Sequence, residues 1–529
     1  MKLNLLRAVP FFLLLFSFGK LCAQIPEPIF EAEPAMEFFT KKKEILQTLL
    51  YSDETGHYAL FASGKYGDGK KSIRKFTLDF QPTDYRVKLD FPKKTLEPNT
   101  IGIVTLGKNL YHFWKVRNRK SIDYFVQEID LKSQSKKSVT LVVSLDYKNG
   151  YSTYTKSHLV KDRETTQVHL VTQIFGNQKD PVEIRIDSFD EKLNPLNTLN
   201  LSLTHPTEQF QLLSVTPYDE KKYVLVGKHH SSRNISKSVK RKEYEYFVYN
   251  LTDGEAQVLH TISPNDTHLN GLITSIKDDK LFMTGLIGKH NPSKPSSIYY
   301  LQYDLSRLQM DFEKRNRLPD TFYNYPEKRD EKTPTLQVGF RNKKREADSN
   351  YQIKDLFLND NNETILIAEQ NFFTENSAPI TNGQGAITPT LGRKMFYSND
   401  IAVFKMSKEG DFLWHSKIMK RQQWGGDISV LSFYPTFKNN TLFLFYNGNY
   451  INIENPGANF LTKNDAALMC TVINADGTFQ RNVVTYYTEE YPNVVLPRLC
   501  NYKEDIGAVL YHRAPGNLKR QKFTRIILN

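Results

Sequence analysis

The side chains most able to bind a ligand are lysines and arginines that gather between apolar segments of the chain. The sequence has 71 Lys and Arg against 58 Asp and Glu, which gives a formal net charge of +13. A concentrated positive surface attracts polyanions at long range and speeds their association. The bases that we predict to face such a ligand are Lys70, Lys71, Arg117, Arg119, Lys120, Arg233, Lys240, Arg241, Lys242, Arg393, Lys519 and Arg520.

Motifs for catalysis or for a metal ion are missing from the sequence. Neither His-x-x-x-His nor Cys-x-x-Cys occurs, and the turn at 360–363 lacks the alternating oxygen ligands of a calcium loop. His229 and His230 are neighbours, and neighbours on a strand point to opposite faces. No Gly-x-Ser-x-Gly elbow and no Walker sequence is present. We therefore predict no catalytic residue, no metal and no cofactor, although carboxylates brought together from distant segments would leave no local signature.

The elements that must position these bases are short strands. Apolar and aromatic residues alternate with polar ones, and the chain contains 29 Tyr and 34 Phe, a usage typical of strands. One tight polar turn recurs after such strands, about 50 to 65 residues apart with one gap near 105. Its copies are Leu78-Asp79, Ile129 to Leu131, Phe189 to Glu191, Leu251 to Gly254, Tyr303 to Leu305, Met406 to Gly410 and Ile473 to Gly477.

This period predicts a β-propeller of four-stranded antiparallel blades, with the recurring turn between the two outer strands of each blade. The clearest blade runs from Ile353 to Ile418. The segment from Val494 to Leu528 supplies only three strands, so we expect a strand within Ile29 to Phe39 to close the ring. Eight blades is our first choice and seven the second.

The domain organisation follows from the first residues and from two departures from the period. Lys2, Arg7, the apolar run Val9 to Phe18 and Ala23 match a secretory signal, so we predict a signal peptide over 1–23 and one propeller over 24–529. Insertions are expected at 314–350 and 372–398. The cysteines that remain, Cys470 and Cys500, either pair or stay as separate buried thiols.

Part of the chain resembles a known group of proteins. The segment Ser398 to Lys405, followed by Glu409 to Trp414 and Lys417-Ile418, is similar to the repeat of uncharacterised secreted β-propeller proteins of the Bacteroidota. The likeness is close over Ile353 to Arg421 and general elsewhere. It implies the fold and export, and it brings no established activity. The turn Asn474 to Phe479 also resembles the Asp-box of sialidases, which is a structural turn.

In such a fold the loops between second and third strands open on one end of the ring, and the tight turns open on the other. The predicted bases occupy the first end, and turn acids such as Asp130, Asp190 and Asp476 occupy the second. Solubility alone favours exposed Lys and Arg, and Asp favours turns for backbone reasons. The aromatic residues Tyr111, Phe113, Trp114, Trp414 and Trp424 either stack on sugars or bases or fill the wedges between blades.

We therefore expect an exported binding or scaffold propeller whose basic face contacts an anionic glycan, lipopolysaccharide or another envelope protein. We do not expect nucleic acid or an integral membrane span, and we expect a monomer or a member of an envelope complex. The C-terminus, Phe523 to Asn529, has the pattern of a closing strand, which favours the periplasm over the cell surface or the medium. The alternative is a propeller hydrolase or lyase that acts on acidic polysaccharide, with carboxylates or histidines converging near the axis.

Overall fold

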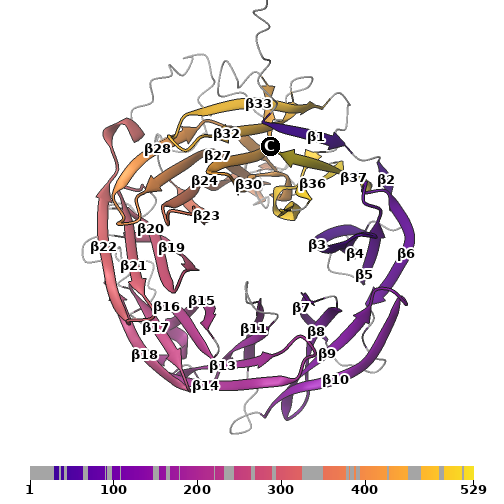
Figure 1. The fold of residues 1–529 in the computed structure, drawn as a ribbon, viewed down its shortest axis with the longest axis vertical. Coiled ribbons are helices and arrows are strands. Elements are labelled where there is room, and N and C mark those ends of the chain that lie inside the picture. Colours follow the sequence, from indigo (N-terminus) through magenta and orange to yellow (C-terminus); the bar gives the residue numbers. More distant parts are fainter. Residues whose placement is uncertain are drawn as a thin grey trace, which may run out of the picture.

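Within each blade, successive strands pair antiparallel in the up-and-down order of propeller blades. The computed structural model describes residues 29–529 except 35–36, 41–43, 64–69, 90, 92–97, 108, 147–153, 162–166, 178, 220, 231–243, 264–267, 289–293, 324–349, 377–379, 382–386, 389–392, 426–427, 451–465, 488–493, 505 and 515–516. Eight sheets form a ring of blades (Figure 1), which confirms the predicted eight-bladed β-propeller.

The first four blades follow one another without interruption. Blade 1 contains β3 (Ile45–Asp53), β4 (Gly56–Ala62), β5 (Lys71–Phe76) and β6 (Pro82–Leu89). Blade 2 contains β7 (Asn99–Leu106), β8 (Asn109–Arg117), β9 (Ser121–Asp130) and β10 (Ser135–Asp146). Blade 3 contains β11 (Tyr154–Lys161), β12 (Val168–Phe175), β13 (Pro181–Phe189) and β14 (Pro195–Pro206). Blade 4, entered through the 3₁₀ turn Thr207–Gln209, contains β15 (Phe210–Asp219), β16 (Lys222–His230), β17 (Tyr244–Thr252) and β18 (Glu255–Ile262).

The next three blades carry longer connections. Blade 5 contains β19 (His268–Lys277), β20 (Lys280–Gly288), β21 (Ser297–Asp304) and β22 (Gln309–Arg317), and the 3₁₀ turn Asp320–Phe322 follows. Blade 6 contains β23 (Tyr351–Leu358), β24 (Thr364–Asn376), β27 (Arg393–Met406) and β28 (Phe412–Ile418), with β29 (Gln422–Trp424) also on β27. Blade 7 follows the 3₁₀ turn Ile428–Val430 and contains β30 (Phe433–Lys438), β31 (Thr441–Asn449), β32 (Ala466–Ile473) and β33 (Phe479–Tyr486).

Blade 8 joins the two ends of the chain. Its inner position is shared by β34 (Val494–Val495) and β35 (Asn501–Lys503), separated by the 3₁₀ turn Pro497–Leu499, and both pair with β36 (Gly507–Ala514). The next strand, β37 (Asn517–Leu528), pairs with β1 (Phe30–Pro34) and with β2 (Phe38–Phe39). Figure 1 shows β1 lying beside β37. The predicted closing strand is confirmed, and it is the outermost strand of the blade.

The core consists of apolar layers between neighbouring blades. Middle strands such as β4 and β32 are buried along their whole length, because each face packs against a different blade. One layer between blades 1 and 2 includes Tyr58, Ile73 and Leu110. Tyr111, Phe113 and Trp114 are also buried, which confirms that they fill wedges between blades.

All seven predicted outer turns connect the third and fourth strands of blades 1 to 7. The insertion boundaries need correction. The residues 314–317 belong to β22, because they continue its ladder with β21, and Phe322 is buried. The residues 372–376 and 393–398 extend β24 and β27 as one long hairpin, and the two-stranded pair β25 (Ile380–Thr381) and β26 (Ile387–Thr388) lies within this insertion. The predicted signal peptide and residues 324–349 lie outside the described residues.

Both remaining cysteines are free thiols, Cys470 buried in β32 and Cys500 beyond the last 3₁₀ turn. The described part of the chain contains no helix long and apolar enough to cross a membrane.

Candidate ligand-binding face

The ring has two ends with different connections. We call the end that carries the second-to-third strand loops and the passages from blade to blade the loop face. The opposite end, which carries the first-to-second and third-to-fourth strand turns, is the turn face. This assignment follows from the strand order of each blade, so every side chain at a strand end can be placed on one face.

Five of the predicted bases lie together on the loop face, over blades 1 and 2. Lys70 and Lys71 stand where β5 begins, and Arg117, Arg119 and Lys120 stand where β8 turns into β9. All of these except Lys71, which is half-buried, are exposed. Within the described residues, none of the five forms an ion pair. The charges of this group, which we call the basic patch, are therefore open to an external anion.

The hairpin between β8 and β9 holds its bases in a fixed place. The amide of Asn118 donates a hydrogen bond to the carbonyl oxygen of Ser121 over 2.8 Å. This bond closes a tight turn whose two central residues are Arg119 and Lys120. A two-residue hairpin leaves little backbone freedom, so this turn presents both cations rigidly at the tip of blade 2.

The charge of Lys71 also reaches the neighbouring blade. Burial lowers the pKa of His112 in β8 to about 4, and the positive charges of Lys71 and Lys136 add to this effect. The His112 ring lies 5.0 Å from the ring of Trp114, and its Nε2 is 3.2 Å from the Thr100 hydroxyl. His112 is therefore neutral near pH 7 and adds no charge to this face.

Two further bases at the loop face escaped the sequence analysis. Lys88 ends β6 and Lys156 lies near the start of β11, and both are exposed. Both lie within strands and not in loops. Polar residues that alternate with apolar ones at the ends of strands are the signal that marks such bases in a sequence. Acids lie here too: Asp123 and Asp146 occupy the same end of blade 2. Among the described residues at the loop-face ends of these two blades, bases outnumber acids.

The predicted basic loop face also carries acids. Glu208 and Asp320 are exposed in passages between blades on this face. Among the described residues, five of the predicted bases stand over blades 1 and 2.

The other predicted bases have different surroundings. Lys519 is exposed in β37. Arg520 donates hydrogen bonds from Nε and one Nη to the carboxylate of Glu37, at 2.7 and 2.9 Å. Its guanidinium therefore ties the N-terminal segment to β37 and is not open to a ligand. Arg393 is the first residue of β27, but its side chain lies outside the described residues, as do Arg233, Lys240, Arg241 and Lys242.

Acids on the turn face serve the turns that contain them. Hydrogen bonds from Ser133 and Lys132 lower the pKa of Asp130. The Ser306 hydroxyl and the Arg307 amide bind Asp304 and, against a smaller effect of burial, help to hold its pKa at about 2. In blade 7, Asp476 accepts hydrogen bonds from the amide and hydroxyl of Thr478, at 2.9 and 2.7 Å. Turn geometry thus explains these acids.

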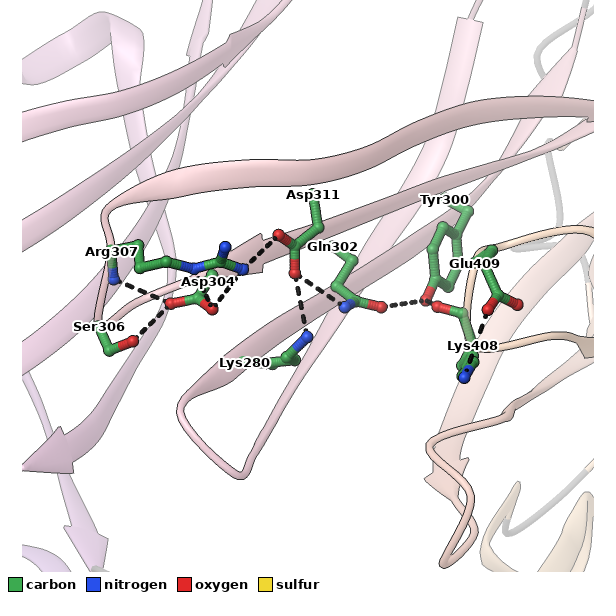
Figure 2. Close-up of polar contacts among 9 residues, drawn as sticks. All are labelled: Lys280, Tyr300, Gln302, Asp304, Ser306, Arg307, Asp311, Lys408 and Glu409. Carbon is green, nitrogen blue, oxygen red and sulfur yellow. Dashed lines mark hydrogen bonds and ion pairs between the residues drawn. The ribbon is translucent and has the colours of Figure 1, made fainter.

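One network on the turn face joins blade 5 to blade 6, and Figure 2 shows it. Asp311 accepts hydrogen bonds from Arg307 at 3.0 Å and from Lys280 and Gln302 at 3.1 Å each. Tyr300 donates to the Lys408 carbonyl oxygen in the next blade's turn over 3.0 Å.

Similar contacts recur where Tyr111 donates to the Glu191 carbonyl oxygen and Trp414 to the Ala475 carbonyl oxygen. These third-to-fourth strand turns therefore lock neighbouring blades together, and Trp414 takes part in this packing.

A buried ion pair stabilises blade 6 near the loop face. The Lys420 Nζ lies 2.7 Å from the Glu369 Oε1, and the two side chains are 1% and 0% exposed. Ser432 donates to the same carboxylate over 2.6 Å, and the Lys354 Nζ lies 3.3 Å from it. Burial alone would raise the pKa of Glu369, but the Lys420 and Lys354 ammonium groups outweigh it and hold the pKa at about 2. The carboxyl is therefore ionised and lies between two ammonium groups.

The same polar network continues into blades 7 and 8. Gln422 donates to the Asn447 carbonyl oxygen over 2.8 Å, and Asn447 donates to the Val495 carbonyl oxygen over 2.7 Å. Tyr487 donates to the Asn447 Oδ1 over 2.7 Å. These side chains thus connect blades 6, 7 and 8 at their loop-face ends and hold the three blades in place.

A histidine cluster lies between blades 3 and 4 at the loop face. The His205 ring lies 4.4 Å from the Phe247 ring and 4.6 Å from the His229 ring, and its Nε2 is 2.7 Å from the Tyr249 hydroxyl. Burial and the neighbouring His229 lower the pKa of His205. His230 contacts Tyr244 instead, so the two adjacent histidines do point to opposite faces. The residues of this cluster come from different blades, which is why no sequence motif marked it.

The shifted carboxyl groups of the described residues bear on the enzymatic alternative. Every carboxyl group whose pKa is shifted there is shifted downward, namely Asp130, Asp190, Asp304, Glu363, Glu369 and Asp476. A general acid for glycosidic cleavage needs a raised pKa. The described part of the chain also holds no group of three or more metal-binding side chains.

No protein-family model matches the sequence, and no curated protein matches it. Solved structures are similar at low identity. The polysaccharide lyase Uly1 is 9% identical with a TM-score of 0.35, over 93% of this chain and 99% of that chain. The Nup133 β-propeller domain of Vanderwaltozyma polyspora is 9% identical with a TM-score of 0.35, over 81% and 100%.

A prolyl endopeptidase structure is 9% identical with a TM-score of 0.39, over 89% of this chain and 54% of that chain. The chain thus spans about half the length of that enzyme. These similarities are too low to bear on function.

Proposed function

We propose that this protein is an exported binding propeller whose basic patch holds an anionic glycan or an anionic surface of an envelope partner. The observation that carries the proposal is that Lys70, Arg117, Arg119 and Lys120 are exposed at one end of two adjacent blades, with no ion-pair partner among the described residues. Such a surface draws polyanions until salt screens it beyond about 8 to 10 Å.

The turn face offers a contrast that supports this choice. Acids there such as Asp304 and Asp311 bind their own backbone or neighbouring bases. Charges that are already satisfied gain little from a ligand. The exposed bases of the basic patch form no ion pair among the described residues, and we place the binding function there.

Export is the second part of the proposal. It rests on the charged and apolar residues before Gln24, which match a secretory signal. A protein recovered from the periplasm that begins at Gln24 on N-terminal sequencing would support it, and recovery of an uncleaved cytoplasmic chain would contradict it.

The charge-reversal variant Arg119→Glu/Lys120→Glu tests the binding function. We expect its dissociation constant for heparin to rise about tenfold or more, because two rigidly presented cations become anions, and a tenfold change corresponds to about 1.4 kcal/mol. Retention on a heparin column and titration against soluble heparin and lipopolysaccharide measure the effect.

Blade 2 also supplies the matched control. Lys132→Glu/Lys136→Glu makes the same change in net charge at the turn-face end of this blade, where both lysines are exposed. We expect this control to retain most of the affinity. Equal losses in the two variants would show that net charge alone governs binding, and unchanged retention of Arg119→Glu/Lys120→Glu would overturn the proposal.

A further inference from the structure

Three aromatic side chains form a row on the part of blade 6 that extends beyond the loop face. The strands β24 and β27 continue past the body of the blade, and β29 pairs with β27 there. Phe373 is directly opposite Phe396, and Phe396 is directly opposite Trp424. Directly opposite residues of antiparallel strands point to the same side of the sheet, so the three rings share one side.

The row is open to solvent at its Phe373 end. Phe373 is 52% exposed, and its ring lies 6.2 Å from the ring of Phe396. Phe396 and Trp424 are half-buried and pack against the layer that contains Val430. The Lys394 Nζ lies 5.5 Å from the centre of the Phe373 ring. The row therefore combines a supported aromatic surface with a cation at its exposed end.

Two tyrosines of blade 7 lie at the same junction. Tyr450 and Tyr486 are 37% and 57% exposed, and their rings are 5.6 Å apart. Tyr486 is directly opposite Ala467, whose side chain belongs to the apolar layer between blades 6 and 7. The tyrosines thus lie on the side of blade 7 that faces blade 6.

The aromatic row faces blade 7 in return. Gln422 lies two residues before Trp424 on β29 and therefore points to the same side. Its Nε2 donates to the Asn447 carbonyl oxygen in blade 7 over 2.8 Å. The two aromatic groups consequently border one junction at the loop face.

We propose that Phe373, Phe396, Trp424, Tyr450 and Tyr486 form a saccharide-binding subsite for an acidic polysaccharide. The apolar faces of sugar rings pack on aromatic rings, and a few polar groups at the edge fix their orientation. Here the tyrosine hydroxyls and the Lys394 ammonium supply these groups, although Glu375 lies opposite Lys394 in the strand register. The inference deepens the proposed function, because it rests on the attraction of polyanions to the same face.

The distribution of exposed rings favours a sugar over a protein partner. Phe373, Tyr450 and Tyr486 are the exposed rings in this group, and they come from three different strands or strand ends. Protein interfaces bury contiguous apolar areas. Exposed rings with hydroxyl or ammonium groups beside them suit successive units of a polysaccharide.

The double variant Phe373→Ala/Tyr486→Ala tests the subsite against three soluble probes: polygalacturonate, its carboxyl-reduced neutral form, and inorganic polyphosphate. We expect wild-type protein to bind polygalacturonate and the variant to bind it at least about tenfold more weakly, or about 1.4 kcal/mol. Affinity for polyphosphate, which has no sugar ring, should not change. Phe373→Leu, which keeps apolar bulk without a ring, should also weaken sugar binding.

The control is Phe479→Ala, which removes an exposed aromatic ring at the opposite end of the strand that carries Tyr486. It should bind all three probes as wild type does. The subsite is overturned, and the basic patch is not, if the double variant binds polygalacturonate normally or if wild type binds only polyphosphate. A lowered melting temperature with unchanged sugar binding would assign the rings to packing within this chain. Failure of wild type to bind any polyanion would overturn both proposals.

Discussion

Replacing Phe38 by alanine is expected to lower the free energy of unfolding by about 3 to 5 kcal/mol, the usual cost of truncating a buried phenylalanine. Phe38 is 3% exposed and lies among Phe61, Phe76 and Phe523, with ring centres 6.4, 5.1 and 5.7 Å away. These partners belong to blades 1 and 8. The side chain thus anchors the N-terminal segment in the layer where the ring closes.

Phe39 provides the matched control for this prediction. It is the next residue of β2 but is 68% exposed. Phe39→Ala should change stability by no more than about 0.5 kcal/mol, as is usual for surface positions. Urea unfolding of both variants measures the difference. Equal stabilities of the Phe38 and Phe39 variants would contradict the role of this segment in ring closure.

The second large effect is expected at the buried ion pair of blade 6. Glu369→Gln should cost about 3 to 5 kcal/mol, because it leaves the Lys420 ammonium buried without its counter-charge. The double variant Glu369→Gln/Lys420→Met should be more stable than this single variant, since it removes both charges. Lys314→Met, which breaks the exposed pair between Lys314 and Asp411, should cost less than about 1 kcal/mol.

The same pair predicts a dependence of stability on pH. The pKa of Glu369 is about 2 in the folded protein, against 4.5 for an unperturbed glutamate. A depressed carboxyl pKa contributes stability above the unfolded value, and this contribution is lost as the pH falls through the folded value. Wild type should therefore lose stability between about pH 4.5 and 2 to a greater extent than Glu369→Gln/Lys420→Met. Parallel losses in both proteins would contradict the assignment.

Local sequence signals were sufficient to predict the fold. The outer turns could be found because an Asp or Asn side chain caps its own turn, as Asp190 does when it accepts hydrogen bonds from the Lys192 and Asn194 amides. Such bonds join residues close in sequence, so the turn leaves a readable pattern. The closing strand could be expected because the last segment of the chain supplies only three of the four strands of a blade.

The candidate site was only partly predictable, because its contacts are long-range. Glu369 lies in β24, and Lys420 follows β28, which is two strands away in the same sheet. The two side chains meet through this strand order, and no spacing in the sequence predicts the contact. Arg520 belongs to a basic cluster in the sequence, but Glu37 from the other end of the chain binds it. The aromatic row depends on the register of β24, β27 and β29. A sequence shows which residues are charged or aromatic, but it does not show which distant residues they contact.

Hydrogen exchange of the wild-type protein with and without heparin tests the central claim most directly, because it locates the bound polyanion on one end of the ring. We predict slower exchange at the loop-face hairpin of residues 117–121 and at the start of β5, and no change at the turn-face turns of residues 130–135 and 190–194. Protection that falls on those turns, or equally on both ends, would contradict a binding face made by the basic patch.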